Sequence, residues 1–62
     1  MTLAERIKAQ RIAKGYSQEE VAGRLGVSRQ AVAKWENGQS APSTGNLFKL
    51  AEVFGTTVDL LL

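Results

Sequence analysis

Apolar side chains recur along this chain at the three- and four-residue spacing of amphipathic helices, separated by capping and turn residues. The pattern predicts a first helix over about residues 3–14 and two short helices within residues 17–38. A fourth helix is expected from residue 43 or 44 to about residue 54, with a short final turn over 58–62. The predicted fold class is all-α: a compact bundle of four to five short helices, in one domain spanning residues 1–62.

The most informative stretch reads YSQEEVAGRLGVSRQAVAKWENG. Ser17 and Glu20 have the spacing of a capping box, in which each side chain bonds the backbone N–H of the other residue. Gly26 tolerates the positive φ that a sharp turn requires, and Ser28 caps a second helix directly after it. Two helices joined by so short a turn form a helix-turn-helix, here over residues 17–38.

The second helix of this motif has two distinct faces. With residues 29–37 placed about 100° apart, one side carries Val32 and Trp35. The opposite side has no acidic residue and carries arginine, glutamine and lysine, namely Arg29, Gln30 and Lys34. Such residues are ordinarily just solvated surface, but beside two caps and a turn glycine at fixed spacing they predict a face that reads purine edges in the major groove.

Arg11 falls inside the apolar arc of the first predicted helix. That arc is formed by Leu3, Ala4, Ile7 and Ile12. A lone guanidinium directed at a core is costly, so Arg11 needs an anionic partner. Glu36, at the apolar seam of the second motif helix, is the expected partner; the alternative is that Arg11 extends to water.

The C-terminal third carries more apolar surface than one small face requires. The core stripe of the fourth helix is formed by Leu47, Leu50, Ala51 and Phe54. Phe48 and Val53 fall off this stripe, where we expect flank packing, with a subunit contact as the alternative; Gly45 lowers helix propensity in the first turn, which is expected to fray. The final segment is too short to be a stable helix alone, so its apolar side chains must bury against something. They are Val58, Leu60, Leu61 and Leu62.

Composition excludes several function classes. The chain has neither cysteine nor histidine, so disulfides, thiol nucleophiles and the common transition-metal sites are not expected, and we predict no metal and no cofactor. It also lacks a glycine-rich phosphate loop and a carboxylate pair on an apolar face, so an enzyme is not expected. The net charge is +2, with +3 in residues 1–38 and −1 in residues 39–62, which places a mild basic footprint on the helix-turn-helix end. No apolar run of membrane-span length and no signal peptide is seen, so we expect a cytoplasmic protein without a membrane partner.

Four segments carry a resemblance that covers nearly the whole chain: YSQEEVAGRLGVS, RQAVAKWENG, APS followed by LFKLAEVFG, and TTVDLLL. The chain resembles the lambdoid phage repressor and Cro-type (XRE-like) helix-turn-helix domains. The resemblance implies a lambda-repressor-like fold and a sequence-specific double-stranded DNA-binding regulator of transcription, a bacterial or phage-encoded repressor. It further implies a homodimer on a palindromic operator.

The resemblance also assigns residues. It implies base reading by Arg29, Gln30 and Lys34, a partly buried Arg11–Glu36 pair, and a dimer contact through Val58, Leu60, Leu61 and Leu62. Ala33, on the same face as the base readers, is expected to contact a thymine methyl group. Helix N-termini and the loop after the reading helix supply phosphate-binding candidates, namely Gln18, Ser28, Asn37 and Gly38. Relatives often carry basic residues in that loop, whereas here it reads QSAPST, which predicts weaker binding and a shallower salt dependence.

Other functions fit the same pattern. A DNA-binding antitoxin or restriction-modification controller would share the fold and the DNA contacts, and an antitoxin would also bind a protein partner. A protein-binding adaptor would use the same face without a steep salt dependence. RNA binding is disfavoured because a helix does not fit the deep, narrow groove of duplex RNA.

Overall fold

The computed structural model describes all 62 residues and contains five α-helices and no strand. In chain order they are α1 (Leu3–Lys14), α2 (Gln18–Leu25), α3 (Arg29–Asn37), α4 (Thr44–Phe54) and α5 (Val58–Leu61). The all-α class and the helix boundaries predicted from the sequence are confirmed. The first turn of α4 is present despite Gly45, with the N–H of Leu47 bonded to the carbonyl of Ser43 at 2.8 Å.

Each helix is preceded by a serine or threonine whose hydroxyl accepts a hydrogen bond from the backbone N–H three residues later in the chain. These caps are Thr2, Ser17, Ser28, Ser43 and Thr57. At α1 and α2 a glutamate completes the capping box, and the Thr2 N–H donates to Glu5 at 2.8 Å. This bond from the Thr2 backbone, followed by the Thr2 hydroxyl, lowers the pKa of Glu5. Local hydrogen bonds therefore fix where each helix starts.

The helices close around one small core to which all five contribute. Its ten buried residues are Ile7, Val21, Ala22, Leu25, Val32, Trp35, Leu50, Ala51, Phe54 and Leu61. All ten are apolar: no polar or charged residue is buried when its backbone and side chain are counted together. The apolar stripes predicted for α3 and α4 are confirmed, because Trp35, Leu50 and Phe54 all point into this core.

Three packing predictions need correction. Ile12 is 59% exposed, because it lies on the side of α1 opposite Leu3 and Ile7 and finds no helix to cover it. Phe48 is 57% exposed, so flank packing is confirmed for Val53 but is wrong for Phe48. Leu61 is fully buried in its own protomer's core, so it is not available as a dimer contact.

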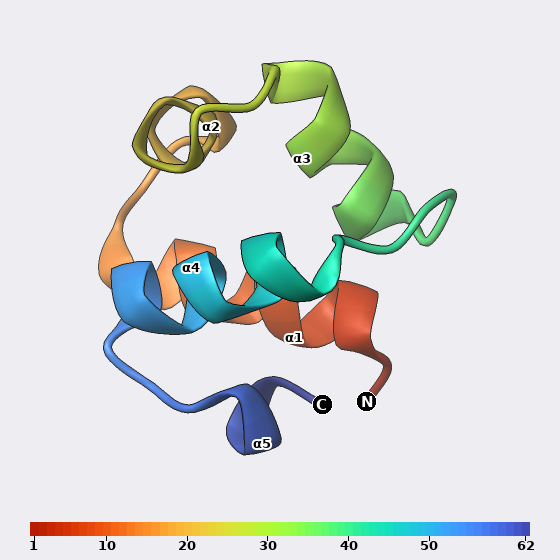
Figure 1. Ribbon diagram of the computed structural model, residues 1–62, viewed down its shortest axis with the longest axis vertical. Helices are drawn as coiled ribbons and strands as arrows, with labels where there is room; N and C mark the ends of the chain where they lie inside the picture. Colours follow the sequence, from red (N-terminus) through yellow and green to blue (C-terminus); the bar gives the residue numbers. More distant parts are fainter.

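The arrangement separates the two ends of the molecule. Figure 1 shows α2 and α3 at one end, α1 and α4 across the middle, and α5 with both chain ends at the other. None of the helices is long and apolar enough to cross a bilayer. The helices α3 and α5 therefore occupy opposite sides of one small body.

The two phenylalanines of α4 test the core assignment. Phe54→Ala removes a side chain that is 1% exposed and should lower the free energy of unfolding by about 3 to 5 kcal/mol, through lost burial and a residual cavity. Phe48→Ala makes the same chemical change at an exposed position of the same helix and should stay within about 0.5 kcal/mol. Urea unfolding followed by circular dichroism, at low protein concentration, measures both. Equal losses would contradict the assignment.

Candidate nucleic-acid interface

α3 presents a polar, cation-bearing side to solvent. Arg29, Gln30, Lys34 and Asn37 are exposed and Ala33 is partly exposed. On the inward side, Val32 is 0% and Trp35 is 6% exposed. The division of this helix into an apolar and a basic face is confirmed, and four candidate base-reading residues share the outward side.

The short turn between α2 and α3 fixes the position of α3. Gly26 ends α2 with φ of +73°, a conformation that L-residues rarely adopt, and the next N–H, of Val27, donates to the Ala22 carbonyl at 3.0 Å. The Ser28 hydroxyl then accepts from the Ala31 N–H at 3.1 Å. The chain thus leaves one helix and enters the next within three residues, so the angle between α2 and α3 is closely constrained.

Arg11 and Glu36 form a bidentate ion pair between α1 and the end of α3. The Arg11 Nε donates to Glu36 Oε2 at 2.7 Å, and Nη2 donates to Oε1 at 3.1 Å. The two side chains are 14% and 2% exposed. A third donor, Nη1, reaches the Tyr16 carbonyl at 2.9 Å, in the turn between α1 and α2. The predicted pair is confirmed, and the hydrogen bond with Glu36 raises the pKa of Arg11 against the opposing effect of burial.

Gln18 extends this network to the first residue of α3. Its Nε2 donates to Glu36 Oε1 at 3.2 Å, and its Oε1 accepts from Arg29 Nη1 at 3.3 Å. Sequence reasoning placed Gln18 only as a phosphate contact and missed both bonds. The only signal for them was the position of Gln18 in the first turn of α2, and that position does not indicate which way the amide points.

The residues proposed to contact phosphates differ in whether they have a hydrogen-bond donor that is not already used within the protein. The Gly38 N–H bonds the Trp35 carbonyl at 3.3 Å as part of the C-cap of α3, so Gly38 has no donor left and its assignment as a phosphate contact is corrected. The Gln39 N–H also turns inward, to the Lys34 carbonyl at 3.0 Å. Ser28 and Asn37 remain exposed.

The cations of α3 have no acidic partner. Arg11–Glu36 is the only salt bridge in the structure, so neither Arg29 nor Lys34 is neutralised by a carboxylate within 4 Å. The surface around α3 is therefore suited to an anionic partner.

On the exposed side of α2, Arg24 lies over the Tyr16 ring, with its Cζ 4.5 Å from the ring centroid. The sequence pattern did not predict this contact.

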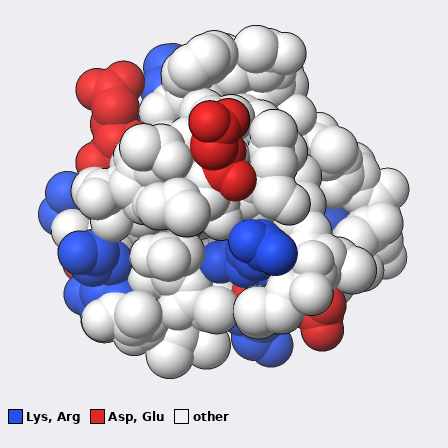
Figure 2. Space-filling model, turned by 90° about the horizontal axis from the view of Figure 1, so that it is seen from below, with Lys and Arg blue, Asp and Glu red and all other residues white.

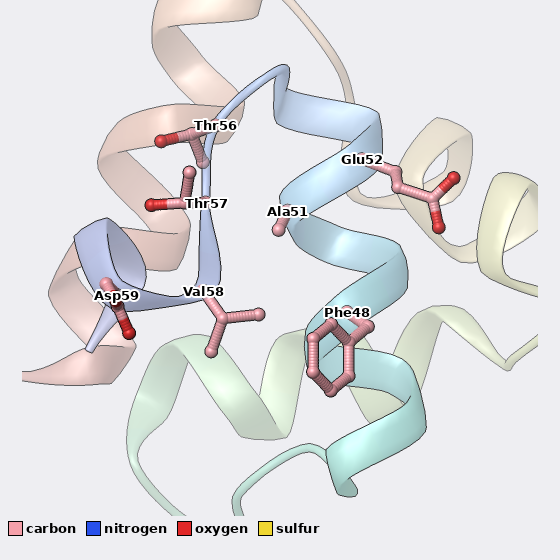
Figure 3. A pocket seen from close by; sticks show the side chains of 7 residues that line it. All are labelled: Phe48, Ala51, Glu52, Thr56, Thr57, Val58 and Asp59. Atoms are coloured by element: carbon pink, nitrogen blue, oxygen red, sulfur yellow. The ribbon is translucent and has the colours of Figure 1, made fainter.

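The opposite end of the molecule carries exposed apolar side chains. Leu60 and Leu62 are 65% and 61% exposed, while Val58 packs partly against the core. Figure 2, seen from the side of α5, shows mostly uncharged surface between scattered charged groups. Figure 3 shows Val58 facing Phe48 in a pocket between α4 and α5. Three of the four predicted dimer residues thus reach the surface, and one of them, Val58, lies beside Phe48.

Known proteins are similar to this chain in sequence and in fold. A family model described as Helix-turn-helix matches residues 7–61. The chain is 43% identical over 58 residues to the SPbeta prophage-derived uncharacterized HTH-type transcriptional regulator YonR of Bacillus subtilis, covering 94% of this chain and 54% of that protein. It spans only 30% to 54% of the length of the first curated relatives it matches.

Solved structures give the same result. The P22 c2 repressor in complex with a synthetic operator superposes with a TM-score of 0.95 at 31% identity, covering 100% of this chain and 94% of that one. The restriction-modification controller protein C.AhdI of Aeromonas hydrophila superposes with a TM-score of 0.90 at 35% identity, covering 97% and 91%. The lambda-repressor-like fold expected from the sequence is confirmed.

Removal of Arg11 tests how α3 is held. Arg11→Met leaves the Glu36 carboxylate buried without its cation, and should lower the free energy of unfolding by about 3 kcal/mol while preserving the fold. Arg11→Met combined with Glu36→Met removes the charge as well, and should recover most of that loss. Thermal unfolding of the two variants provides the comparison. If Arg11→Met is as stable as the double variant, the Arg11–Glu36 pair does not hold α3 in place.

Proposed function

This chain belongs to the helix-turn-helix family, and we propose that it is a sequence-specific regulator of transcription that reads duplex DNA with α3. The observation that carries the proposal is the outward face of α3, which places exposed Arg29, Gln30 and Lys34 on one side, without a paired carboxylate. The structural similarity to an operator-bound repressor supports the same assignment.

In the proposed complex α2 crosses the DNA backbone and α3 enters the major groove with its N-terminal residues toward the base edges. The Arg29 guanidinium suits guanine O6 and N7, and the Gln30 amide suits adenine N6 and N7. Lys34 suits guanine through a single donor, and the Ala33 methyl suits a thymine methyl group. The inward packing of Val32 and Trp35 supports this arrangement because it keeps those four side chains on the free side.

Phosphate contacts are assigned to exposed groups at helix ends. Ser28 lies at the N-terminus of α3, where free N–H groups and the helix dipole favour an anion, and Asn37 lies at its C-terminus. The following loop, residues 39–43, contains no basic residue. With few cations close to the backbone, the affinity should fall less steeply with salt than that of a strongly basic binder.

The proposed unit is a homodimer that binds two half-sites about one helical turn apart. Exposed Leu60 and Leu62, together with Val58, would form the contact between protomers. Because α5 lies at the end of the molecule opposite α2, a contact there leaves the α3 face open (Figure 1). The regulatory role proposed is repression through occupancy of an operator.

A second role is supported by the similarity to C.AhdI: a restriction-modification controller that binds the promoter of its own operon. Its DNA-reading face would be the same. A restriction or modification gene beside the coding sequence would favour this role. A toxin gene there would instead favour a DNA-binding antitoxin.

Selection of bound duplexes from a random pool tests the base readers. The wild-type chain should enrich a motif, and Arg29→Ala and Lys34→Ala should each relax the preference at one position, by about 1 to 3 kcal/mol of discrimination. Arg24→Ala is the control, because it removes a cation on α2 that is stacked on Tyr16 and lies outside the reading face. Uniform weakening by Arg29→Ala, with an unchanged motif, would make Arg29 a phosphate contact. No attraction to any duplex at low ionic strength would refute DNA binding.

Sedimentation equilibrium tests the dimer. The wild-type chain should self-associate at high micromolar concentration, and Leu60→Lys should leave it monomeric, because it places a charge in the proposed contact. Ile12→Lys makes a similar change at an exposed apolar residue of α1 and should leave the dimer intact. A wild-type chain that is monomeric at these concentrations would contradict the proposal.

A further inference from the structure

The short helix α5 carries an acidic residue in the middle of its exposed apolar surface. Leu61 is 0% exposed and faces the core, while Leu60 and Leu62 are 65% and 61% exposed. Successive helical residues lie about 100° apart, so Asp59 is nearly opposite Leu61, on the outward side between the two exposed leucines. The surface proposed for the contact between protomers therefore contains a carboxylate.

This carboxylate has no cation of its own. The only salt bridge in the protomer joins Arg11 and Glu36, so no basic side chain lies within 4 Å of the Asp59 carboxylate. A contact made by Leu60 and Leu62 would remove water from Asp59, and a desolvated charge without a partner is costly. A two-fold contact centred on α5 also brings two such carboxylates toward each other, so each of them needs a cation.

Arg6, on α1, places a cation beside the same surface. Its Nη1 donates to the Leu60 carbonyl at 3.2 Å, so the guanidinium lies against α5. That is the only hydrogen bond made by the Arg6 side chain within the protomer, and its Nε is buried without a partner. The guanidinium thus keeps unused N–H donors next to the exposed leucines. Figure 2 shows groups of both charge signs on this face of the molecule.

We propose that in the homodimer Arg6 of each protomer pairs with Asp59 of the partner subunit, and that these two symmetric ion pairs set the register in which the α5 helices meet. This inference rests on the proposed homodimer and adds the residues that make the contact specific. In a two-fold interface each contact occurs twice, so one such pair implies a second. The exposed leucines supply apolar area without direction, whereas complementary charges select one register and one partner.

Charge reversal and mixing test the pairing. Arg6→Glu places two acids opposite each other in the dimer, and Asp59→Arg places two cations there. Each variant alone should therefore dimerise at least about tenfold more weakly than the wild type. An equimolar mixture of the two variants restores both ion pairs, but only between unlike chains, and should form a heterodimer with close to the wild-type affinity. Sedimentation equilibrium of each variant and of the mixture measures these affinities.

Matched controls make the same charge changes away from α5. Lys8→Glu gives the same net charge as Arg6→Glu, at an exposed position two residues further along α1 and nearly opposite to Arg6 around that helix. Glu19→Arg gives the same net charge as Asp59→Arg, at an exposed position of α2 at the other end of the molecule. Both controls should dimerise like the wild type. Circular dichroism at low protein concentration checks that every variant is folded.

A neutral variant covers the case in which a reversed charge disturbs α5. Asp59→Asn keeps the shape of the side chain and removes its charge. It should weaken the dimer and make its affinity less dependent on salt than that of the wild type, because salt screens the ion pairs and not the leucine contact.

Three results would overturn the pairing while leaving the proposed homodimer in place. A mixture that associates no better than the separate variants means that Arg6 and Asp59 do not meet between protomers. Single variants that dimerise like the wild type place the contact elsewhere. A stronger dimer with Asp59→Asn means that the carboxylate is unpaired in the contact. A wild-type chain that is monomeric at high micromolar concentration instead refutes the homodimer itself, and the pairing with it.

Discussion

The position of α3 depends on a buried carboxylate. Glu36 is almost removed from water at the end of α3, and a charge in that place is tolerable only because Arg11 supplies two donors. The same guanidinium bonds the turn before α2, and the same carboxylate bonds Gln18. One pair of side chains therefore ties α1, α2 and α3 together at their meeting point, and the small apolar core alone would specify their relative positions less closely.

The two opposite sides of α3 have different roles. Its Val32 and Trp35 side is committed to the core, so the other side is free of any packing role. With the only nearby acid turned inward to Arg11, the outward side keeps an uncompensated positive charge, although the whole chain carries only +2. The placement of charge, rather than its total, makes this face attractive to a polyanion.

Local rules predicted the helices well. Caps such as Ser17 with Glu20, and the turn at Gly26, depend only on residues a few positions apart, so the sequence alone predicted them. The Arg11–Glu36 pair was also predictable, because only one acid lay at the right seam. Ile12, Leu61 and the N–H of Gly38 were assigned wrongly, since each depends on which neighbouring element covers it. The bonds of Gln18 depend on how closely α2 crosses α3, which periodicity does not reveal.

The caps described at each helix start have a consequence for kinetics. Because every helix carries its own start signal within four residues, much of what specifies each helix lies within the helix and its cap. Helical chains dominated by such short-range contacts cross their folding barrier in times on the order of microseconds to milliseconds. A molecule of this kind regains its native form quickly after heat or dilution from denaturant, and spends little time with its apolar residues open to aggregation.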